Sequence, residues 1–229
     1  MNQAINQIGI LGGSFDPVHM GHIGLAQETQ SRFNLDQILF LPVFQSPHKS
    51  HIPLASRSHR MAMLRLALKG NTHFSISDTE MNREEVSYTI DTVNRFRLKY
   101  SSSELCLIMG YDNLLDLDLW KDSRKIMENC HILVASRPGL KAFSSTGKVF
   151  GLFNGDSPYR LGKIKNKTQE FIHRETGKKL IVYDISPRDI SSSVVRERLV
   201  LGKPVDNLLP PEVETYIIEH QIYKIRPKL

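Results

Sequence analysis

The chain of 229 residues has two cysteines, one tryptophan and no long apolar run. Cys106 and Cys130 cannot form a disulfide framework, and neither belongs to a Cys-x-x-Cys pair or a zinc-ligand spacing. Because both lie in apolar stretches, we expect buried structural thiols. No segment approaches the roughly 18 apolar residues of a membrane span, and residues 1–7 lack a signal-peptide pattern. These absences predict a soluble, cytoplasmic protein.

The composition is that of an ordinary globular protein, with 40% hydrophobic and 24% charged residues. This balance excludes a disordered or fibrous chain. At roughly 150 residues per domain, the length suits one domain with a sizeable core. We therefore expect one domain over residues 1–229, in which residues 190–229 form a helical C-terminal subregion.

The net charge of +6 is concentrated in one window of the chain. Residues 141–179 hold nine Lys or Arg against three acidic residues. Such a window can contact nucleic acid or polyphosphate, but no nucleic-acid motif accompanies it. A solvated basic face is the simpler interpretation.

Short apolar runs alternate with helical patterns along the chain. Strands are predicted at 8–11, 37–41, 74–77, 105–109, 131–135 and 180–183, and helices at 20–33, 56–68, 88–100, 113–127, 191–201 and 211–220. This alternation predicts an α/β fold, a Rossmann-like doubly wound parallel sheet with a small C-terminal helical extension. Residues 140–179 show no clear pattern, so we expect a less regular basic insert there.

The stretch from Gly12 to His22, GGSFDPVHMGH, joins the first predicted strand to the first helix. Open α/β folds bind ligands at this edge of the sheet. Gly12 and Gly13 let a ligand approach the backbone, and the helix offers free N–H groups to an anion. His19 and His22 project toward the same end. Because a helix N-terminus disfavours a protonated imidazole, the pair predicts a bound anion.

A second polar cluster opens the helix predicted at 191–201. Ser191, Ser192 and Ser193 can cap the helix or bind phosphate through their hydroxyls and free amides. Arg196 near the helix start opposes the helix dipole, as the histidines do, and also suggests an anion. Simple capping beside a surface arginine is the alternative.

These motifs resemble those of a known family. GGSFDPVHMGH resembles the His-x-Gly-His signature of the nucleotidyltransferase superfamily, which includes class I aminoacyl-tRNA synthetases. Within it, the chain resembles bacterial nicotinate-mononucleotide adenylyltransferases. Five further blocks follow in family order: PVFQSPHK at 42–49, SYTIDT at 87–92, Gly110-Tyr-Asp112 followed by Trp120, RPG at 137–139 and ISSSVVR at 190–196. The chain departs from the family at Ser46, where the family has proline, and residues 140–179 match no block.

The resemblance implies transfer of the AMP moiety of ATP to nicotinate mononucleotide, giving nicotinate adenine dinucleotide (deamido-NAD) and pyrophosphate in NAD biosynthesis. It implies a catalytic set of His19, His22, Lys49 and Arg196. The implied ATP-binding residues are Gly12, Gly13, Ser14, Phe15, His19, His22, Ser191, Ser192 and Arg196. The implied nicotinate-mononucleotide-binding residues are His48, Lys49, Tyr88, Thr89, Asp112, Trp120 and Arg137. Mg²⁺ is expected with ATP, and no protein metal ligand is predicted.

Several of these residues also have a plain physical interpretation. Trp120 follows several leucines, so core packing competes with stacking on a heteroaromatic ligand. Asp112 follows a strand and suits either a helix cap or an acceptor for a ribose hydroxyl. Free amides where a helix starts at Tyr88 suit a carboxylate, and the loop holding His48 and Lys49 suits phosphates.

Other functions stay open on the sequence alone. Another adenylyltransferase of the superfamily would use nicotinamide mononucleotide or phosphopantetheine as acceptor. A non-catalytic nucleotide-binding regulator would keep the fold without turnover. We expect ATP and nicotinate mononucleotide as partners, with neither nucleic acid nor membrane, and the oligomeric state is not predicted.

Overall fold

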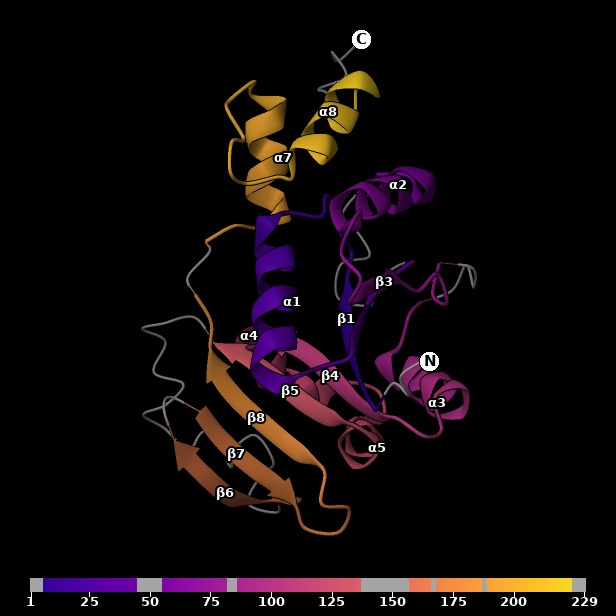
Figure 1. The fold of residues 1–229 in the computed structure, drawn as a ribbon, viewed down its shortest axis with the longest axis vertical. Coiled ribbons are helices and arrows are strands. Elements are labelled where there is room, and N and C mark those ends of the chain that lie inside the picture. Colours follow the sequence, from indigo (N-terminus) through magenta and orange to yellow (C-terminus); the bar gives the residue numbers. More distant parts are fainter. Residues whose placement is uncertain are drawn as a thin grey trace.

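The computed structural model describes residues 6–44, 55–81, 86–136, 157–165, 168–186 and 189–223. Figure 1 shows one twisted sheet with helices against it and two helices, α7 (Ser192–Val200) and α8 (Pro211–Glu219), beyond one end. In this part of the chain, no helix combines the length and apolar character that crossing a membrane requires.

The sheet has eight strands in the order β3-β2-β1-β4-β5-β8-β7-β6. The parallel strands are β1 (Gln7–Gly13), β2 (Gln37–Pro42), β3 (Phe74–Ile76), β4 (Glu104–Gly110), β5 (His131–Ser136) and β8 (Lys179–Asp184). In register, Ile8 of β1 lies opposite Gln37 of β2 and Leu105 of β4. The predicted Rossmann-like sheet is confirmed, and short buried apolar strands explain it because helices cover both faces.

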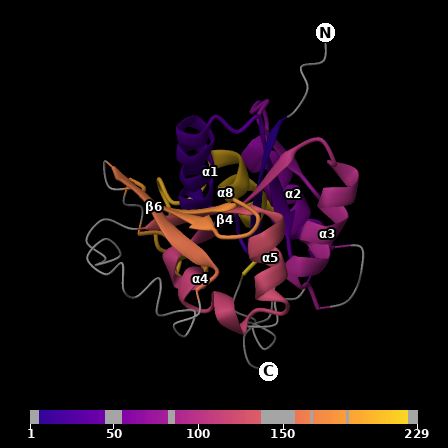
Figure 2. The same ribbon diagram turned by 90° about the horizontal axis from the view of Figure 1, so that it is seen from below.

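The helices divide between the two faces. Side chains of α1 (Met20–Phe33), α2 (Arg57–Leu68), α7 and α8 share one core cluster with Leu11 of β1. Side chains of α3 (Thr89–Lys99), α4 (Tyr111–Leu115) and α5 (Ser123–Asn129) share the other with Ile8 and Ile10. Figure 2 shows α1 and α8 on one side of β4 and β6, and α4 and α5 on the other. The extension is therefore packed against the same core as α1 and α2.

Local signals explain where several helices begin and end. The hydroxyl of Ser56 accepts a hydrogen bond from the His59 backbone N–H at the start of α2. Pro211 starts α8, where its missing N–H has no helical partner to lose. Asn34 ends α1 in the left-handed conformation that asparagine tolerates. The buried residues of α2 include Met63 and Leu64 but not Met61.

Two sequence predictions need correction. The helix expected at 113–127 is instead α4, a short 3-10 helix η1 (Leu117–Leu119) and α5. The backbone is extended at Trp120 and left-handed at Asp122, so the chain is not helical between η1 and α5. The supposedly irregular insert contains β6 (Tyr159–Lys165) and β7 (Thr168–His173), an antiparallel pair that lengthens the sheet beyond β8.

The strand order reverses direction between β1 and β4. From β1 the chain proceeds outward through β2 and β3, and β4 then lies on the opposite side of β1. The carboxyl ends of these neighbouring parallel strands, Gly13 and Gly110, lie at the same edge. Such a switch point leaves a crevice at the carboxyl edge in which α/β proteins bind ligands.

Candidate active site

The loop from β1 to α1 carries two stacked histidines at this switch point. The rings of His19 and His22 have centroids 3.7 Å apart and planes at 27°. His19 is 5% exposed, and this burial lowers its pKa to about 4. The His19 backbone N–H donates to Nδ1 of His22 over 3.2 Å. A neutral His22 therefore carries its proton on Nε2.

Small residues make room for these rings. A Cβ added at Gly21 would lie 2.9 Å from Nδ1 and 3.0 Å from Cε1 of His19. A Cβ at Gly13 would lie 3.2 Å from the ring of Phe15, which packs edge-on to His22 with 5.0 Å between centroids. Phe15 is fully buried, so its ring supports His22 from within the core.

The start of α7 lies against the same loop. Ser191 caps α7, its hydroxyl accepting from the Val194 backbone N–H over 3.2 Å, which is one of the two roles that the sequence left open. The hydroxyl of Ser192 donates to the carbonyl of Pro17 over 3.1 Å. Arg196 donates from Nη1 to the carbonyl of Asp16 over 2.6 Å. The start of α7 therefore contacts the loop that leads into the histidine pair. The two segments are some 170 residues apart in the chain.

Asp16 is a site residue that the sequence analysis missed. Its carboxylate is fully buried, and Oδ2 lies 3.6 Å from Nη1 of Arg196. The Arg196 charge therefore has a protein counterion, so this arginine alone does not indicate a bound anion, contrary to our interpretation. Asp16 belongs to the GGSFDP stretch, but no sequence signal predicts its burial.

Arg60 of α2 was also missed. It is 3% exposed and donates from Nη1 to the carbonyls of Ser14 and Val43 over 3.0 and 2.7 Å. Nη2 donates to the carbonyl of Phe44 over 3.3 Å. Burial lowers its pKa, although an arginine stays charged in proteins. A basic residue on the apolar stripe of a helix was the available signal, because Arg60 shares that stripe with Met63.

The start of α3 and the segment after η1 contact each other. Tyr88 is the N-cap of α3 and Thr89 its first residue, so the free amides lie where the sequence predicted. Lys121 lies over Tyr88, with Nζ 4.5 Å from the ring centroid and 3.7 Å from Asp91 Oδ2. Trp120 is partly buried against the core cluster of α3 to α5. Its indole combines core packing with a partly exposed surface.

The remaining predicted residues divide into two groups. Asp112 is exposed in the first turn of α4, and Gly110, not Asp112, is the N-cap, so the cap interpretation was wrong. His48, Lys49 and Arg137 lie outside the described residues. Both cysteines are buried, as predicted, and burial raises the pKa of each thiol to about 12.

Comparison with known proteins identifies the family of this chain. The Cytidylyltransferase-like family model matches residues 10–198, which include both motif segments. The chain belongs to this family. A relative from Geotalea daltonii is 36% identical, with 95% of this chain and 98% of the relative aligned. A relative from Pelobacter propionicus is 34% identical over 96% of this chain and its own full length. Both bear the name "probable nicotinate-nucleotide adenylyltransferase".

Solved structures agree with this family fold. Plasmodium falciparum nicotinic acid mononucleotide adenylyltransferase complexed with NaAD superimposes with a TM-score of 0.72, covering 95% of this chain and 97% of that one at 18% identity. The same protein complexed with APC gives a TM-score of 0.70 at 17% identity. At this identity the likeness extends to the fold alone.

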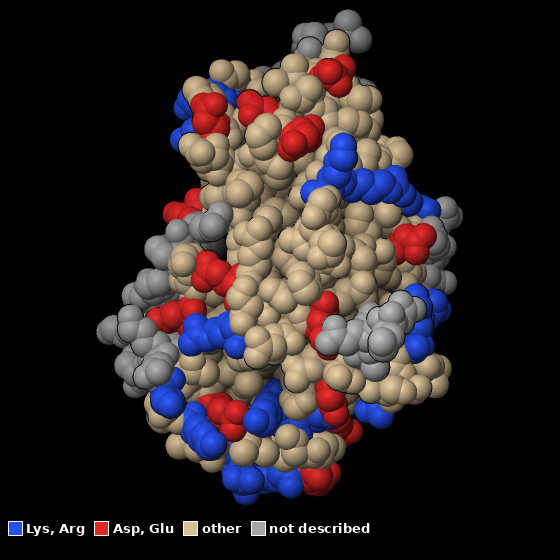
Figure 3. All heavy atoms as spheres, viewed as in Figure 1, with Lys and Arg blue, Asp and Glu red and all other residues tan. Residues whose placement is uncertain are grey.

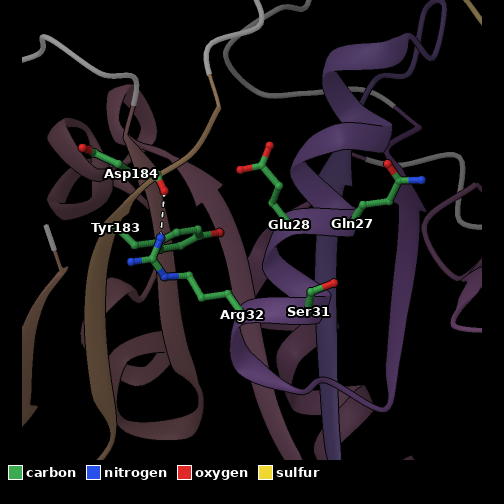
Figure 4. A pocket seen from close by; sticks show the side chains of 6 residues that line it. All are labelled: Gln27, Glu28, Ser31, Arg32, Tyr183 and Asp184. Atoms are coloured by element: carbon green, nitrogen blue, oxygen red, sulfur yellow. Dashed lines mark hydrogen bonds between the residues drawn. The ribbon is translucent and has the colours of Figure 1, made fainter. Parts of the chain in front are cut away.

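Two other surface features of this family member lie away from the motif residues. A hollow of about 430 Å³ between α1 and β8 is lined by Gln27, Glu28, Ser31, Arg32, Tyr183 and Asp184. Figure 4 shows Arg32 reaching across to the Asp184 carbonyl, and a second Arg32 bond goes to Thr168. Glu28 accepts from the Ser186 backbone N–H. Arg32 and Glu28 therefore already have protein partners in this hollow.

The basic end of the molecule is the second feature. Figure 3 shows Lys and Arg gathered at the end formed by β6 to β8, with acidic side chains among them. Lys179 Nζ lies 3.1 Å from Glu170 Oε2. The mixture of both signs matches the solvated basic face favoured by the sequence.

Proposed function

We propose that this chain transfers the AMP moiety of ATP to nicotinate mononucleotide, releasing pyrophosphate and forming nicotinate adenine dinucleotide for NAD biosynthesis. The observation that carries this proposal is the stacked His19–His22 pair at the start of α1, beside the start of α7. Near full-length relatives with that activity in their names support it.

The reaction needs positioning and charge neutralisation more than acid–base chemistry. A phosphate oxygen of the mononucleotide attacks the α-phosphorus of ATP in line, and the bond from that phosphorus to the bridging oxygen breaks. The nucleophile is already anionic, so no general base is required. Negative charge on the α-phosphate and on departing pyrophosphate is what the protein must stabilise.

The ATP side of the site is assigned to the two helix starts. His22 donates from Nε2 to the reacting phosphates, and Ser191 keeps its hydroxyl proton to donate because its oxygen serves as acceptor for the helix. Arg196 has N–H groups beyond those bonded to Asp16 and Ser193. Backbone amides at Gly12, Gly13, Ser14 and Phe15 and the hydroxyl of Ser192 complete the assignment.

A bound phosphate also changes the protonation of His19. In the protein without ligand, burial alone makes the charged imidazole unfavourable. A phosphate oxygen beside the rings favours the charged form and opposes that burial penalty. On this proposal, His19 is protonated when the phosphate is bound and neutral when it is absent.

The start of α3, the start of α4 and Trp120 are assigned to nicotinate mononucleotide. The backbone amides at Tyr88 and Thr89 face its carboxylate, and Trp120 stacks on the pyridine ring. Asp112 accepts a hydrogen bond from a ribose hydroxyl. His48, Lys49 and Arg137 are assigned to its phosphate from the family motifs. Each of these roles is part of the proposal.

Magnesium enters as part of the substrate Mg²⁺–ATP. Within the described ranges, no group of three or more His, Cys, Asp or Glu is arranged to hold a metal ion. The phosphates and water supply the ligands that Mg²⁺ prefers.

The test is pyrophosphate release by the purified protein with Mg²⁺–ATP and nicotinate mononucleotide. The wild type should turn over, and His22→Ala should lose about 10²–10³-fold in rate because a charge-stabilising donor is removed. His73→Ala, an exposed histidine bonded to the Asp36 carbonyl, is the control and should be unaffected. Binding of ATP without turnover would instead indicate a regulator.

A further inference from the structure

Tyr223, at the end of the described chain, reaches the loop between β1 and α1. Its hydroxyl donates to Oδ1 of Asp16 over 2.7 Å, and the two residues are 207 positions apart. Burial and then the Asp16 carboxylate raise the pKa of this hydroxyl, so its proton is retained for the bond. The C-terminal segment is thereby tied to the loop that carries the histidine pair.

The backbone adopts an unfavourable conformation where it delivers this side chain. Gln221 and Tyr223 both have positive φ, 53° and 64°, although neither is glycine. Left-handed backbone at such residues persists where surrounding contacts require it, and it clusters at functional sites. The backbone N–H of Ile222 donates to the carbonyl of Ile217, which fixes the turn after α8.

The two oxygens of Asp16 have different surroundings. Oδ1 accepts from the Tyr223 hydroxyl and from the Ala55 backbone N–H, the latter over 2.9 Å. Oδ2 has no hydrogen bond from the described residues and faces Nη1 of Arg196 at 3.6 Å. Because both donors bind Oδ1, they hold the carboxylate in an orientation that leaves Oδ2 3.6 Å from Nη1 of Arg196.

This orientation matters because Arg196 has two possible anionic partners. A carboxylate free to rotate would close on the guanidinium and form the short, bidentate pair that arginine favours. The guanidinium would then have fewer N–H groups for a phosphate. Held as it is, Asp16 anchors Arg196 through its own carbonyl and competes weakly for the charge.

We propose that Tyr223 is a positioning residue that restrains Asp16 and so keeps Arg196 available to the phosphates of ATP. The inference rests on the proposed function only in taking a nucleoside triphosphate as the ligand of Arg196. It does not depend on which acceptor receives the AMP.

Binding of a non-hydrolysable ATP analogue with Mg²⁺, measured by calorimetry, tests the proposal without any acceptor. Tyr223→Phe removes only the hydroxyl and should weaken binding about tenfold, the effect of one hydrogen bond to a charged group. Tyr216→Phe is the matched control, because its hydroxyl bonds His59 on α2 rather than Asp16. That variant should bind the analogue as the wild type does.

A double-variant cycle separates positioning from loss of stability. In an Asp16→Asn background no carboxylate competes for Arg196, so adding Tyr223→Phe should leave affinity within about twofold. The same holds in an Arg196→Ala background. An equal tenfold loss in either background, or wild-type affinity in Tyr223→Phe, would overturn the proposal. If the wild type failed to bind the analogue, the proposed function would fail and the restraint would have no ligand to serve, whereas binding without turnover would remove the proposed function alone.

Discussion

His19 and His22 stack with ring centroids 3.7 Å apart, and His19 is almost entirely buried. Two imidazolium charges at that distance would repel each other strongly, and burial adds to the cost. The charged form of His19 is therefore unfavourable unless an anion lies beside it.

The first prediction concerns stability against pH. The folded pKa of His19 is about 4 and its ordinary value is 6.5, so the unfolded chain binds its proton first on acidification. His19 should not affect the pH dependence above pH 6.5 and should lower the free energy of unfolding as the pH falls toward 4. The total loss should be about 3 kcal/mol.

Urea denaturation at several pH values, compared with His19→Asn, measures this effect. The difference between the two proteins should change by up to about 1.4 kcal/mol per pH unit between pH 6 and pH 4.5. Parallel curves for the two proteins would show that His19 is not held neutral by burial.

A second prediction concerns the glycine between the histidines. In Gly21→Ala the new Cβ would lie 2.9 Å from Nδ1 of His19, so the ring must move. A shift of this size at a reacting group lowers kcat by about 10–100-fold. Gln27→Ala, in the same helix but away from the histidines, should leave turnover unchanged. Normal kcat in Gly21→Ala would mean that the position of the His19 ring does not matter.

A third prediction concerns the buried cation of α2. Arg60→Met leaves the carbonyls of Ser14, Val43 and Phe44 without their donor, so we expect a loss of about 2–4 kcal/mol. The melting temperature should fall by about 5–15 °C for a chain of this length. The exposed Arg65 on the same helix is the control, and Arg65→Met should melt within about 2 °C of the wild type. Equal melting of both variants would contradict this assignment.

Many element positions were predictable, because their signals are local. The bounds predicted for α1 agree with the structure, and those of the central parallel strands differ by one or two residues. Apolar runs and helical periodicity supplied these signals. By contrast, β6 shows no apolar alternation, since it is an edge strand whose residues after Tyr159 are mostly exposed. The break between α4 and α5 depends on the left-handed backbone conformation of Asp122, which no turn motif in the sequence predicts.

The candidate site was predictable to the extent that it uses contiguous motifs. His19, His22, Ser191 and Arg196 were recognised from short segments, and the fold brings those segments together. Asp16 was not recognised, because its role depends on partners at positions 196 and 223. Such a buried charge is defined by the tertiary structure and leaves no periodic trace in the sequence.

A fourth prediction concerns preference for the acceptor. Lys121 lies over Tyr88, beside the amides assigned to the nicotinate carboxylate. Because Lys121 is about half exposed, its attraction to that carboxylate is worth up to about 1 kcal/mol. Lys121→Met should raise KM for nicotinate mononucleotide up to about fivefold and leave KM for the amide unchanged. Lys125→Met, whose partner is Asp122, is the control. An equal rise in KM for both acceptors would show that Lys121 does not attract the nicotinate carboxylate.

The central claim is adenylyl transfer to nicotinate mononucleotide, and a competition assay tests it most directly. The purified protein receives Mg²⁺–ATP with equal concentrations of nicotinate and nicotinamide mononucleotide, and the two dinucleotide products are separated and quantified. Their ratio equals the ratio of the two kcat/KM values. The account predicts that nicotinate adenine dinucleotide predominates. Predominance of the amide dinucleotide would contradict it, as would the absence of both products when a parallel assay with phosphopantetheine gives an adenylylated product.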